Sequence, residues 1–280
     1  MPEATLDGVH FAYPGGAEVF SGAGLTLHLE GGAVALVGEN GAGKTTLTKL
    51  LNGLLRPAAG TVVVNGVAVA GRSVARMAAV VGYAFQNPDD QLFERTVRAE
   101  VAFGPRAMGR PGAQVRAVVG RALESCGLET KADAHPHDLG LAERKWVVIA
   151  SALAANPPVV VLDEPTLGQD APSRSRLRDL VVRLAAEGRL VIVVSHDIDF
   201  VAESCSTVVM LAHGEVLHQG PVERAFDDLA LCAAAGIRPP HVSQLARALG
   251  ADSPPVRETG FVAWWRGRPQ PGSPAERALE

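Results

Sequence analysis

The sequence predicts an α/β fold in which a mixed or parallel core sheet follows an N-terminal antiparallel β subdomain and carries an inserted helical subdomain. Short apolar runs at residues 159–162, 190–194 and 208–211 alternate with a helical pattern at about 172–187. Strands that alternate with helices are typical of a parallel sheet. A glycine-rich loop at residues 38–46 lies between an apolar run and another helical pattern, which places a further strand and helix in the same sheet.

The first third of the chain predicts β structure. Residues 5–13 and 25–29 partly alternate between apolar and polar side chains, as half-buried strands do. Residues 61–69 read TVVVNGVAV and predict a hairpin, because Asn-Gly suits a two-residue turn with positive φ. An apolar run at residues 80–85 predicts one more strand before the pattern changes.

Helical patterns dominate from Gln86 onward, and we expect a helical subdomain at about residues 88–155. Gly-Pro and Pro-Gly breaks separate its expected helices. These helices lie at residues 96–103, 114–126 and 142–155.

The last sixty residues predict a separate extension. Helical patterns near residues 222–235 and 241–249 follow Gly220, and the segment from Ala251 is rich in Pro, Gly and Arg. Such a composition is typical of a flexible tail. We therefore divide the chain into a main domain at residues 1–220, a helical extension at 221–250 and a flexible tail at 251–280.

Composition bounds the class of protein. The chain has 280 residues, of which 47% are hydrophobic and 20% charged, with a net charge of −4. These values are typical of a globular protein and do not favour nucleic acid as a partner. No uninterrupted apolar stretch reaches the roughly 20 residues that span a bilayer, and the first residues lack the pattern of a signal peptide. We therefore expect the chain to remain in the cytosol.

The three cysteines do not predict a metal site. Cys126, Cys205 and Cys232 are far apart in the sequence and lack metal-ligand spacing. We expect them to be small buried side chains in a reducing compartment.

The glycine-rich loop reads GENGAGKTT and fits the phosphate-binding pattern G-x-x-x-x-G-K-[ST]. Glycines let the backbone curl so that successive N–H groups point at phosphate oxygens. The lysine of this pattern reaches the β- and γ-phosphates, and the hydroxyl after it can ligate Mg²⁺. The expected nucleotide-binding residues of this loop are Gly38, Glu39, Asn40, Gly41, Ala42, Gly43, Lys44, Thr45 and Thr46.

A second part of the site follows the apolar run at residues 159–162. The next residues are Asp163, Glu164 and Pro165, so two carboxylates end a predicted strand. Asp163 suits the Mg²⁺ shell, and Glu164 suits the polarisation of an attacking water. Two acids at a strand end could also be solvated or cap a helix, but the upstream phosphate-binding loop favours the functional interpretation.

Two other strand ends carry polar residues that could act at the same site. His196 follows the run at residues 190–194 and could contact a γ-phosphate, and Gln86 follows the run at 80–85 and could reach Mg²⁺ or water. Taken singly, each residue is more often structural.

Together these landmarks resemble the ATPase subunits of ATP-binding cassette (ABC) transporters over about residues 3–250. The resemblance implies a P-loop NTPase fold of the ABC ATPase type that binds ATP and Mg²⁺. It implies that Gln86 is the Q-loop residue, Glu164 the catalytic base and His196 the switch histidine. Tyr13 matches the aromatic residue that stacks on adenine, although an aromatic residue in a strand pattern is also typical of a core.

A narrower resemblance points to one class of transporter. Residues 86–93, QNPDDQLF, are similar to the cobalt/nickel and vitamin importers of the energy-coupling factor type, and residues 235–240 resemble their C-terminal extension, which implies a dimer contact. In that family two ATPases drive a transmembrane coupling protein and a substrate-capturing membrane protein. Leu92 and Phe93 are expected either near the coupling protein or packed within the helical subdomain. The resemblance implies a peripheral position on the cytoplasmic face of the cell membrane.

The family signature LSGGQ is altered in this chain. The aligned residues are Leu139, Gly140, Leu141, Ala142 and Glu143. The signature presents a helix N-terminus to the nucleotide held by the other subunit, with a serine hydroxyl as an additional donor and glycines for close approach. Here the hydroxyl is missing and two side chains replace glycines, although the helix dipole and the backbone N–H groups could still act.

These changes predict an asymmetric dimer. Each site combines the P-loop of one subunit with the signature of its partner, so the site on this chain's own P-loop is expected to hydrolyse ATP when the partner has a full signature. The opposite site is expected to be weak. Residues 167–170, LGQD, match the D-loop that crosses the same interface. We therefore expect a heterodimer, with a homodimer as the alternative.

Three alternatives to a transport ATPase remain. A soluble ABC ATPase that acts on nucleic acid or the ribosome is disfavoured by the single nucleotide-binding unit and the acidic charge balance. A P-loop kinase is disfavoured by the signature-like segment before Asp163. A mainly regulatory nucleotide-binding subunit is compatible with the altered signature. The cargo is not encoded in this chain, because selectivity would lie in the capture protein.

Overall fold

In the computed structural model, residues 1–268 are described, and they contain a six-stranded core sheet in the order β10-β9-β3-β8-β7-β6. The pairs that join β9, β3, β8, β7 and β6 are parallel, and β10 is antiparallel to β9. The mixed core sheet predicted from the sequence is therefore confirmed. Its strands are β3 (Gly32–Val37), β6 (Val81–Ala84), β7 (Val159–Asp163), β8 (Leu190–Val194), β9 (Thr207–Ala212) and β10 (Glu215–Pro221).

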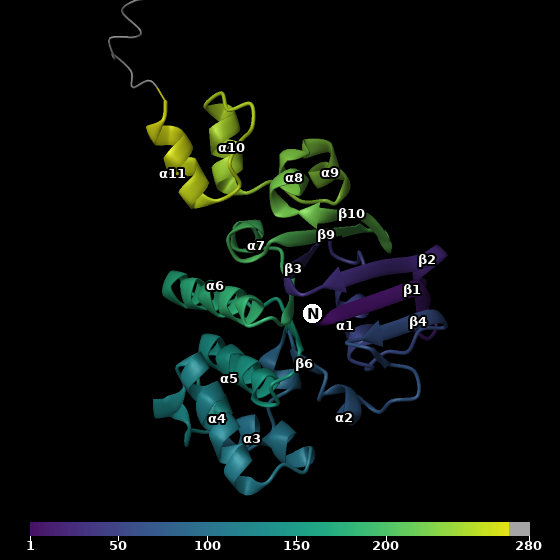
Figure 1. Cartoon of the computed structure of the whole chain (residues 1–280), viewed down its shortest axis with the longest axis vertical. Helices are drawn as coiled ribbons and strands as arrows, with labels where there is room; N and C mark the ends of the chain where they lie inside the picture. The colour runs from purple at the N-terminus through teal and green to yellow at the C-terminus, as the bar shows by residue number, and fades with distance from the viewer. Residues whose placement is uncertain (269–280) are drawn as a thin grey trace, which may run out of the picture.

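A second, antiparallel sheet lies beside the first at the right of Figure 1, with the strand order β2-β1-β4-β5. Its last two strands form the predicted hairpin, in which Asn65 and Gly66 adopt φ values of 49° and 73°. The N-terminal antiparallel subdomain is therefore also confirmed. Its strands are β1 (Glu3–Ala12), β2 (Glu18–Glu30), β4 (Ala59–Val64) and β5 (Val67–Ala68).

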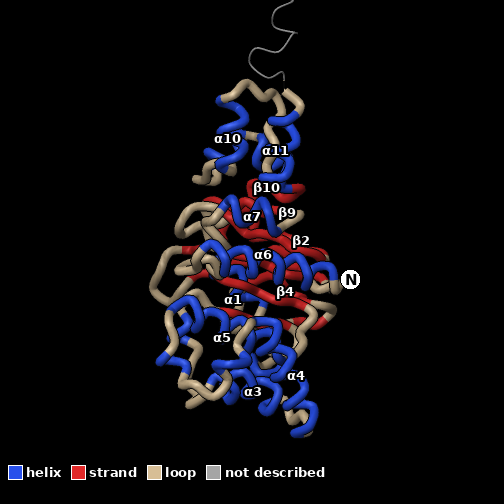
Figure 2. Tube along the Cα trace, turned by 90° about the vertical axis from the view of Figure 1, so that its left-hand side faces the viewer, coloured by secondary structure: helices blue, strands red, loops and turns tan. Residues whose placement is uncertain are grey.

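Helices cover the core sheet and form a separate layer below it. Figures 1 and 2 both show α3, α4 and α5 at one end of the molecule, within the predicted helical subdomain, while α6 and α7 lie alongside the core strands. Side chains cap the start of two of these helices: Thr96 accepts from the Ala99 amide at 3.1 Å, and Asp170 accepts from the Ser173 amide at 2.9 Å. The helices up to this point are α1 (Lys44–Leu51), α2 (Val74–Met77), α3 (Val97–Ala107), α4 (Gly112–Cys126), α5 (Leu141–Ala154), α6 (Ala171–Ala186) and α7 (Ile198–Ser204).

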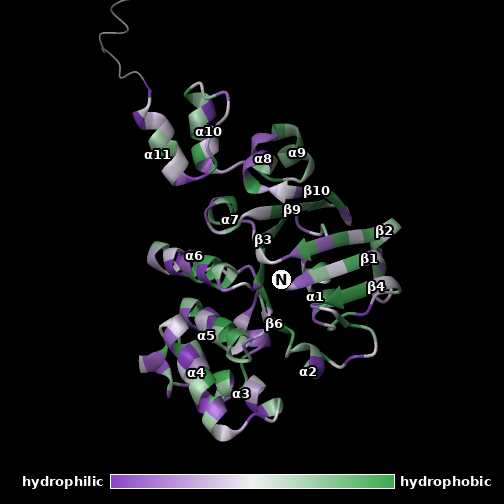
Figure 3. Ribbon diagram, in the orientation of Figure 1, coloured by the Kyte–Doolittle hydropathy of each residue, from purple (hydrophilic) through white to green (hydrophobic). Residues whose placement is uncertain are grey.

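The two faces of the core sheet are buried in different hydrophobic clusters. On β3, Val34 and Leu36 pack with α1 and the antiparallel sheet, whereas Ala33, Ala35 and Val37 pack with the helices on the other face. Burial of both faces explains why the core strands read as continuous apolar runs. In Figure 3 the helices α4 and α6 carry both hydrophilic and hydrophobic residues, as expected for helices with one buried side.

The C-terminal part differs from the sequence prediction in two places. Residues 222–235 form two helices instead of one, because Asp228 adopts extended backbone and its side chain accepts from the Leu231 amide at 2.9 Å. Residues 258–266 form a helix inside the segment predicted to be a flexible tail, and residues 269–280 of that segment lie outside the described part. The helices here are α8 (Val222–Asp227), α9 (Leu229–Ala234), α10 (His241–Ala248) and α11 (Glu258–Arg266).

Specific contacts hold α11 in place. The Arg257 side chain donates from Nε to the Ala202 carbonyl at 2.9 Å, and the Ser243 hydroxyl donates to the Pro255 carbonyl at 2.9 Å. Within α11 itself, the Phe261 and Trp264 rings have centroids 5.7 Å apart. Composition alone does not reveal these contacts, so proline and glycine content is a poor guide to this segment. Within residues 1–268, no helix combines the length and apolar character needed to cross a bilayer.

Candidate functional site

One pocket collects most of the residues that the sequence singled out. It has a cavity volume of about 280 Å³ and lies where β3, β6, β7 and β8 end, at the edge of the core sheet. Parallel strands place their carboxyl ends on one edge, so residues distant in the sequence meet there. The residues that line it are Tyr13, Val19, Asn40, Gly41, Gly43, Lys44, Thr45, Thr46, Gln86, Asp163, Glu164, Val194 and His196.

The glycine-rich loop joins β3 to α1 and depends on its glycines. At Gly38 a Cβ atom would lie 2.0 Å from the Leu211 carbonyl oxygen, and at Gly43 it would lie 2.7 Å from the Phe20 ring. Gly43 is also the N-cap of α1 and supplies no capping side chain, so the first amides of the helix keep their capacity to bind an anion. The loop and the helix N-terminus therefore form a phosphate-binding cradle.

Lys44 lies within this cradle. Its Nζ atom donates to the carbonyl oxygens of Gly38 and Glu39 at 2.7 and 2.8 Å. Burial lowers the pKa of Lys44, and the nearby carboxylates of Glu164 and Asp163 oppose that shift. The ammonium is thus held at the mouth of the loop, where a phosphate chain would pass.

Asp163 has the features of a divalent-cation ligand. Its Oδ2 atom accepts from the Tyr83 hydroxyl at 3.0 Å, while Oδ1 is buried without a hydrogen-bond partner among the described residues. A buried carboxylate oxygen with free lone pairs suits Mg²⁺, which prefers oxygen ligands. Burial raises the pKa of Asp163, and the hydrogen bond from Tyr83 counteracts that rise. Together with Thr45 and Gln86, which line the same pocket, Asp163 fits the Mg²⁺ site predicted from the sequence.

Glu164 and His196 line the same pocket and are in direct contact. Glu164 Oε1 lies 3.3 Å from His196 Nε2, and Glu164 Oε2 accepts from the His196 backbone amide at 3.4 Å. Burial raises the pKa of Glu164 and lowers that of His196. A neutral imidazole can donate one hydrogen bond to the carboxylate, so the two side chains together present polar groups to a water molecule or a phosphate oxygen that enters the pocket.

Gln86 and Tyr13 lie at the rim of the pocket. Gln86 is exposed directly after β6, and Tyr13 has 40% of its surface exposed. The Tyr13 hydroxyl lies 3.1 Å from Thr46 Oγ1, and its ring packs edge-on against Phe11 at a centroid distance of 4.9 Å. Tyr13 is therefore outside the core, with a ring beside the loop.

The altered signature does not line this pocket. Residues 139–143 form the entry to α5, where the Glu143 side chain accepts from the Gly140 amide at 3.2 Å. Leu141 is exposed and packs on Gly168, at which a Cβ would lie 3.1 Å from Leu141 Cδ2. Gln169 Nε2 donates to the Ala142 carbonyl at 3.2 Å. The signature and the D-loop segment are thus in contact with each other and separate from the nucleotide pocket of the same chain.

Three residues that lie next to the site and bond to its residues were not predicted from the sequence: Tyr83, Thr48 and Lys145. The Tyr83 hydroxyl bridges Thr48 Oγ1 at 2.9 Å and the Asp163 carboxylate, and burial raises its pKa, which keeps it a donor. Lys145 is buried and donates from Nζ to the Glu164 carbonyl at 2.5 Å. A polar group within an apolar strand or on an apolar helix face is the signal that could have identified them.

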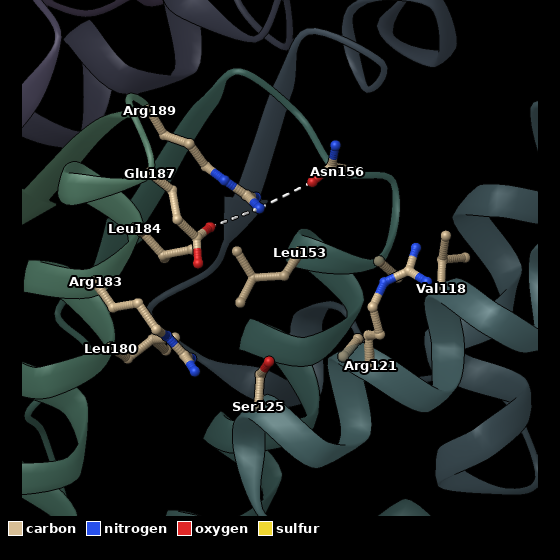
Figure 4. Close-up of a pocket in the computed structure, with 12 residues that line it drawn as sticks. Val118, Arg121, Ser125, Leu153, Asn156, Leu180, Arg183, Leu184, Glu187 and Arg189 are labelled. Atoms are coloured by element: carbon tan, nitrogen blue, oxygen red, sulfur yellow. Dashed lines mark hydrogen bonds and ion pairs between the residues drawn. The ribbon is translucent and has the colours of Figure 1, made fainter.

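A separate pocket of about 210 Å³ lies between α4, the end of α5 and the end of α6 (Figure 4). Arg189 points into it and donates from Nη2 to Asn156 Oδ1 at 2.8 Å and to Glu187 Oε2 at 3.2 Å. Arg121 and Arg183 also line it. None of the predicted site residues does so, which sets this pocket apart from the nucleotide site.

An apolar groove lies between α2 and α3. It comprises two adjoining hollows of about 730 and 290 Å³ that share Ala78, Phe103, Gly104 and Met108. Phe93 and Phe103 are 62% and 47% exposed, and their rings meet edge-to-face with centroids 4.8 Å apart. Leu92, in contrast, is buried in the core of the helical subdomain. Of the two adjacent residues, only Phe93 is therefore available on the surface.

Comparison with known proteins places these features in a family. The family model described as ABC transporter matches residues 23–167. A putative ABC transporter ATP-binding protein of Pyrococcus furiosus is 40% identical over 258 residues, which cover 88% of this chain and 98% of that protein. The energy-coupling factor transporter ATP-binding protein EcfA of Methanocaldococcus jannaschii is 38% identical over 257 residues, or 91% of each chain.

Solved structures of ABC transporter ATP-binding proteins are also similar to this chain. The structure of cbiO1 from Clostridium perfringens, described as part of the ABC transporter complex cbiONQ, has a TM-score of 0.73 at 28% identity and covers 89% of this chain and 98% of that one. A dimeric ATP-binding cassette in a post-hydrolysis state, bound to ADP and Pi, has a TM-score of 0.71 at 25% identity and covers 78% of this chain and 98% of that one.

Proposed function

Since this chain belongs to the ATP-binding subunits of ABC transporters, in which ATP hydrolysis is coupled to transport, we propose that it powers an energy-coupling factor type importer of a metal ion or a vitamin. The observation that carries the ATPase assignment is the convergence of Lys44, Asp163, Glu164 and His196 on one pocket. These residues come from the glycine-rich loop and from the ends of β7 and β8, and each side chain suits its expected role in phosphate binding, Mg²⁺ coordination or water activation.

The hydrolytic step follows from the geometry of these side chains. The amides of the loop and Lys44 bind the phosphate chain of ATP, and Glu164 accepts a proton from the attacking water. His196, which contacts the Glu164 carboxylate, orients the water or the γ-phosphate. Thr45, Gln86 and Asp163 would hold Mg²⁺, which neutralises phosphate charge when bound. Tyr13 would stack on adenine at the rim of the pocket.

The importer class is supported by two kinds of likeness. The first is the similarity to proteins named EcfA and to cbiO1 of the cbiONQ complex. The second lies in the sequence: residues 86–93 and 235–240 resemble segments that this class of ATPase uses for its partners. A soluble ABC ATPase that acts on nucleic acid or the ribosome gains no support from these similarities.

The apolar groove between α2 and α3 suits the transmembrane coupling protein. We expect a short amphipathic helix of that protein to lie in it, because the exposed side chains of Phe93 and Phe103 line this apolar groove. Gln86 belongs to the nucleotide pocket, and Phe93 lies seven residues later in the groove. The segment between them would connect the state of the nucleotide with the membrane partner. Such docking would hold the chain on the cytoplasmic face of the cell membrane, beside the substrate-capturing protein.

A second ATPase subunit is expected to complete the assembly. The altered signature at residues 139–143 favours a heterodimer in which the partner supplies a full signature to the pocket of this chain. The C-terminal helices offer a further contact surface, since Leu245, Val262 and Trp265 are exposed on α10 and α11. A homodimer would bring two altered signatures to its two sites, and both would be weak.

The test is purification of the tagged full chain from gently solubilised membranes of its host, followed by identification of the proteins that accompany it. A second ATPase with an LSGGQ-like signature and two membrane proteins would support the asymmetric importer. Recovery with ribosomes or DNA, and without a membrane protein, would overturn the transport function in favour of a soluble ABC ATPase. Rapid hydrolysis by a purified homodimer would count against the asymmetric arrangement.

A further inference from the structure

Lys145 is a buried cation at an unusual place. Its side chain is only 3% exposed, yet its described hydrogen-bond acceptor is the backbone carbonyl of Glu164 rather than a carboxylate. A methionine or leucine could fill a similar volume without the cost of burying an ammonium group. The presence of a lysine therefore points to a role for its interaction with Glu164.

Glu164 adopts a backbone conformation that needs support. Its φ value of 47° lies in the left-handed region, which is unfavourable for a residue other than glycine. The Glu164 amide donates to the Val194 carbonyl at 2.9 Å, and the Glu164 carbonyl accepts from Lys145 Nζ at 2.5 Å and from the Leu167 amide at 3.4 Å. These contacts fix both ends of the residue whose side chain faces His196.

The Lys145 contact also joins two segments that would contact two different ATP molecules in the proposed dimer. Lys145 lies in the second turn of α5, whose first turn carries the altered signature, and Glu164 ends β7 in the nucleotide pocket. The D-loop residues reinforce this link, because Gly168 packs on Leu141 and Gln169 donates to the Ala142 carbonyl. A movement of α5 would therefore change the hydrogen bond between Lys145 and the Glu164 carbonyl directly.

We propose that Lys145 is a positioning residue for ATP hydrolysis, which holds the Glu164 carbonyl so that the Glu164 carboxylate faces the attacking water, and which makes this geometry depend on the position of α5. The proposal rests on the proposed role of Glu164 as the catalytic base. Lys145 itself does not line the nucleotide pocket, so its loss is expected to affect turnover and leave nucleotide binding in place.

The experiment compares Lys145→Met and Lys145→Arg in the full chain, assembled with the ATPase that co-purifies with it. Methionine keeps the length of the side chain and removes the donor, whereas arginine keeps a charged donor. We expect Lys145→Met to lower kcat by roughly 10-fold or more while KM and the Kd for a fluorescent ATP analogue stay within about 2-fold. Lys145→Arg is expected to recover at least half of the lost activity. Arg98→Met, which removes an exposed cation that pairs with Asp133 at 3.1 Å, is the matched control.

A kcat for Lys145→Met within about 2-fold of the unmodified chain overturns the proposal, as does a loss of kcat and ATP affinity together that arginine fails to rescue. If Lys145→Met does not fold, Lys145→Leu replaces it, because leucine also lacks a donor: a lower kcat than that of Lys145→Arg at equal ATP affinity supports the proposal, and equal kcat values contradict it. Glu164→Gln in the same assay distinguishes failure of the Lys145 proposal from failure of the proposed function. Near-normal turnover of Glu164→Gln would refute the catalytic role of Glu164 itself.

Discussion

Glu164 and Lys44 owe their positions in the site to backbone atoms as much as to other side chains. Lys44 is held by two loop carbonyls, and Glu164 is held by hydrogen bonds to its own amide and carbonyl. Backbone partners change little when surrounding side chains are substituted, so single substitutions at these two residues can report on chemistry rather than on folding. Both residues are predictable from motifs, whereas their supporting contacts are not.

Glu164→Gln is expected to lower ATP turnover by roughly 10²–10⁴-fold, because the amide cannot accept the proton of the attacking water. ATP binding should persist, since Lys44 and the loop amides remain, and ATP should be trapped. Single-turnover hydrolysis together with a filter-binding assay for retained nucleotide measures both effects. Glu124→Gln on the exposed surface of α4 is the control. Turnover close to that of the unmodified chain would remove Glu164 from this role.

The three cysteines are expected to resist alkylation in the folded chain. Cys126, Cys205 and Cys232 are buried, and burial raises their pKa values to about 12, 12 and 11. The reactive thiolate is therefore scarce at pH 8, and reaction with iodoacetamide should be at least about 100-fold slower than in guanidinium chloride. Mass spectrometry of timed samples counts the modified sites, and rapid native labelling of all three would contradict this burial.

At the scale of elements, two functions are proposed for α5, and only one of them can be recognised in its sequence. Its first turn carries the signature that would face a partner's nucleotide, and its second turn carries the lysine that contacts Glu164. The departures from LSGGQ are visible by comparison with a family pattern. The second function is visible only in three dimensions, because α5 must first pack beside β7.

Restoring the signature by Gly140→Ser, Leu141→Gly, Ala142→Gly and Glu143→Gln is expected to raise hydrolysis by a purified homodimer at least about 10-fold. The change adds a hydroxyl donor and allows closer backbone approach, and one well-placed donor can contribute roughly 10²–10³-fold to such reactions. A coupled phosphate-release assay measures the rate. The same four changes combined with Glu164→Gln form the control and should remain inactive. An unchanged rate would show that the altered residues are not what limits the second site.

The elements differ in how far the sequence predicts them. Core strands such as β7 and β8 are buried on both faces and read as apolar runs, and the Asn65–Gly66 turn has its own local signal. In contrast, β10 is an edge strand with half-exposed residues, and α11 depends on contacts with distant segments. Within the site, the glycine-rich loop and the strand-end acids follow from motifs. The contact between Tyr83 and Asp163 could not be predicted, because the two residues are 80 positions apart in the sequence and meet only in the folded chain.

At the scale of the whole molecule, the nucleotide pocket lies between two ends with different surfaces. The helical subdomain is at one end and α10 and α11 are at the other, as both Figures 1 and 2 show. The apolar groove is lined in part by α3, which belongs to the helical subdomain. This arrangement separates the surface proposed for the membrane partner from the extension proposed for the ATPase dimer. The two contacts can therefore be disrupted independently.

The double variant Phe93→Ser and Phe103→Ser is expected to weaken association with the membrane partner about 100-fold. Burial of two aromatic side chains in an interface contributes about 3 kcal/mol or more, and about 1.4 kcal/mol corresponds to a factor of ten. Recovery of the membrane protein with the tagged chain measures the loss, and the Kd for ATP should stay within about 2-fold because neither residue lines the nucleotide pocket. Leu229→Ser, at an exposed apolar residue of α9, is the control. Unchanged recovery would place the partner elsewhere.

The apolar groove has a consequence for how the cell must produce this chain. Phe93 and Phe103 remain in water until a partner covers them, and exposed aromatic surfaces of this kind favour aggregation and recognition by chaperones and proteases. Copies made in excess of the membrane partner would therefore be short-lived. If the groove binds the membrane partner as proposed, it links the abundance of the ATPase to the abundance of the complex, and the subunits would have to be synthesised in balanced amounts.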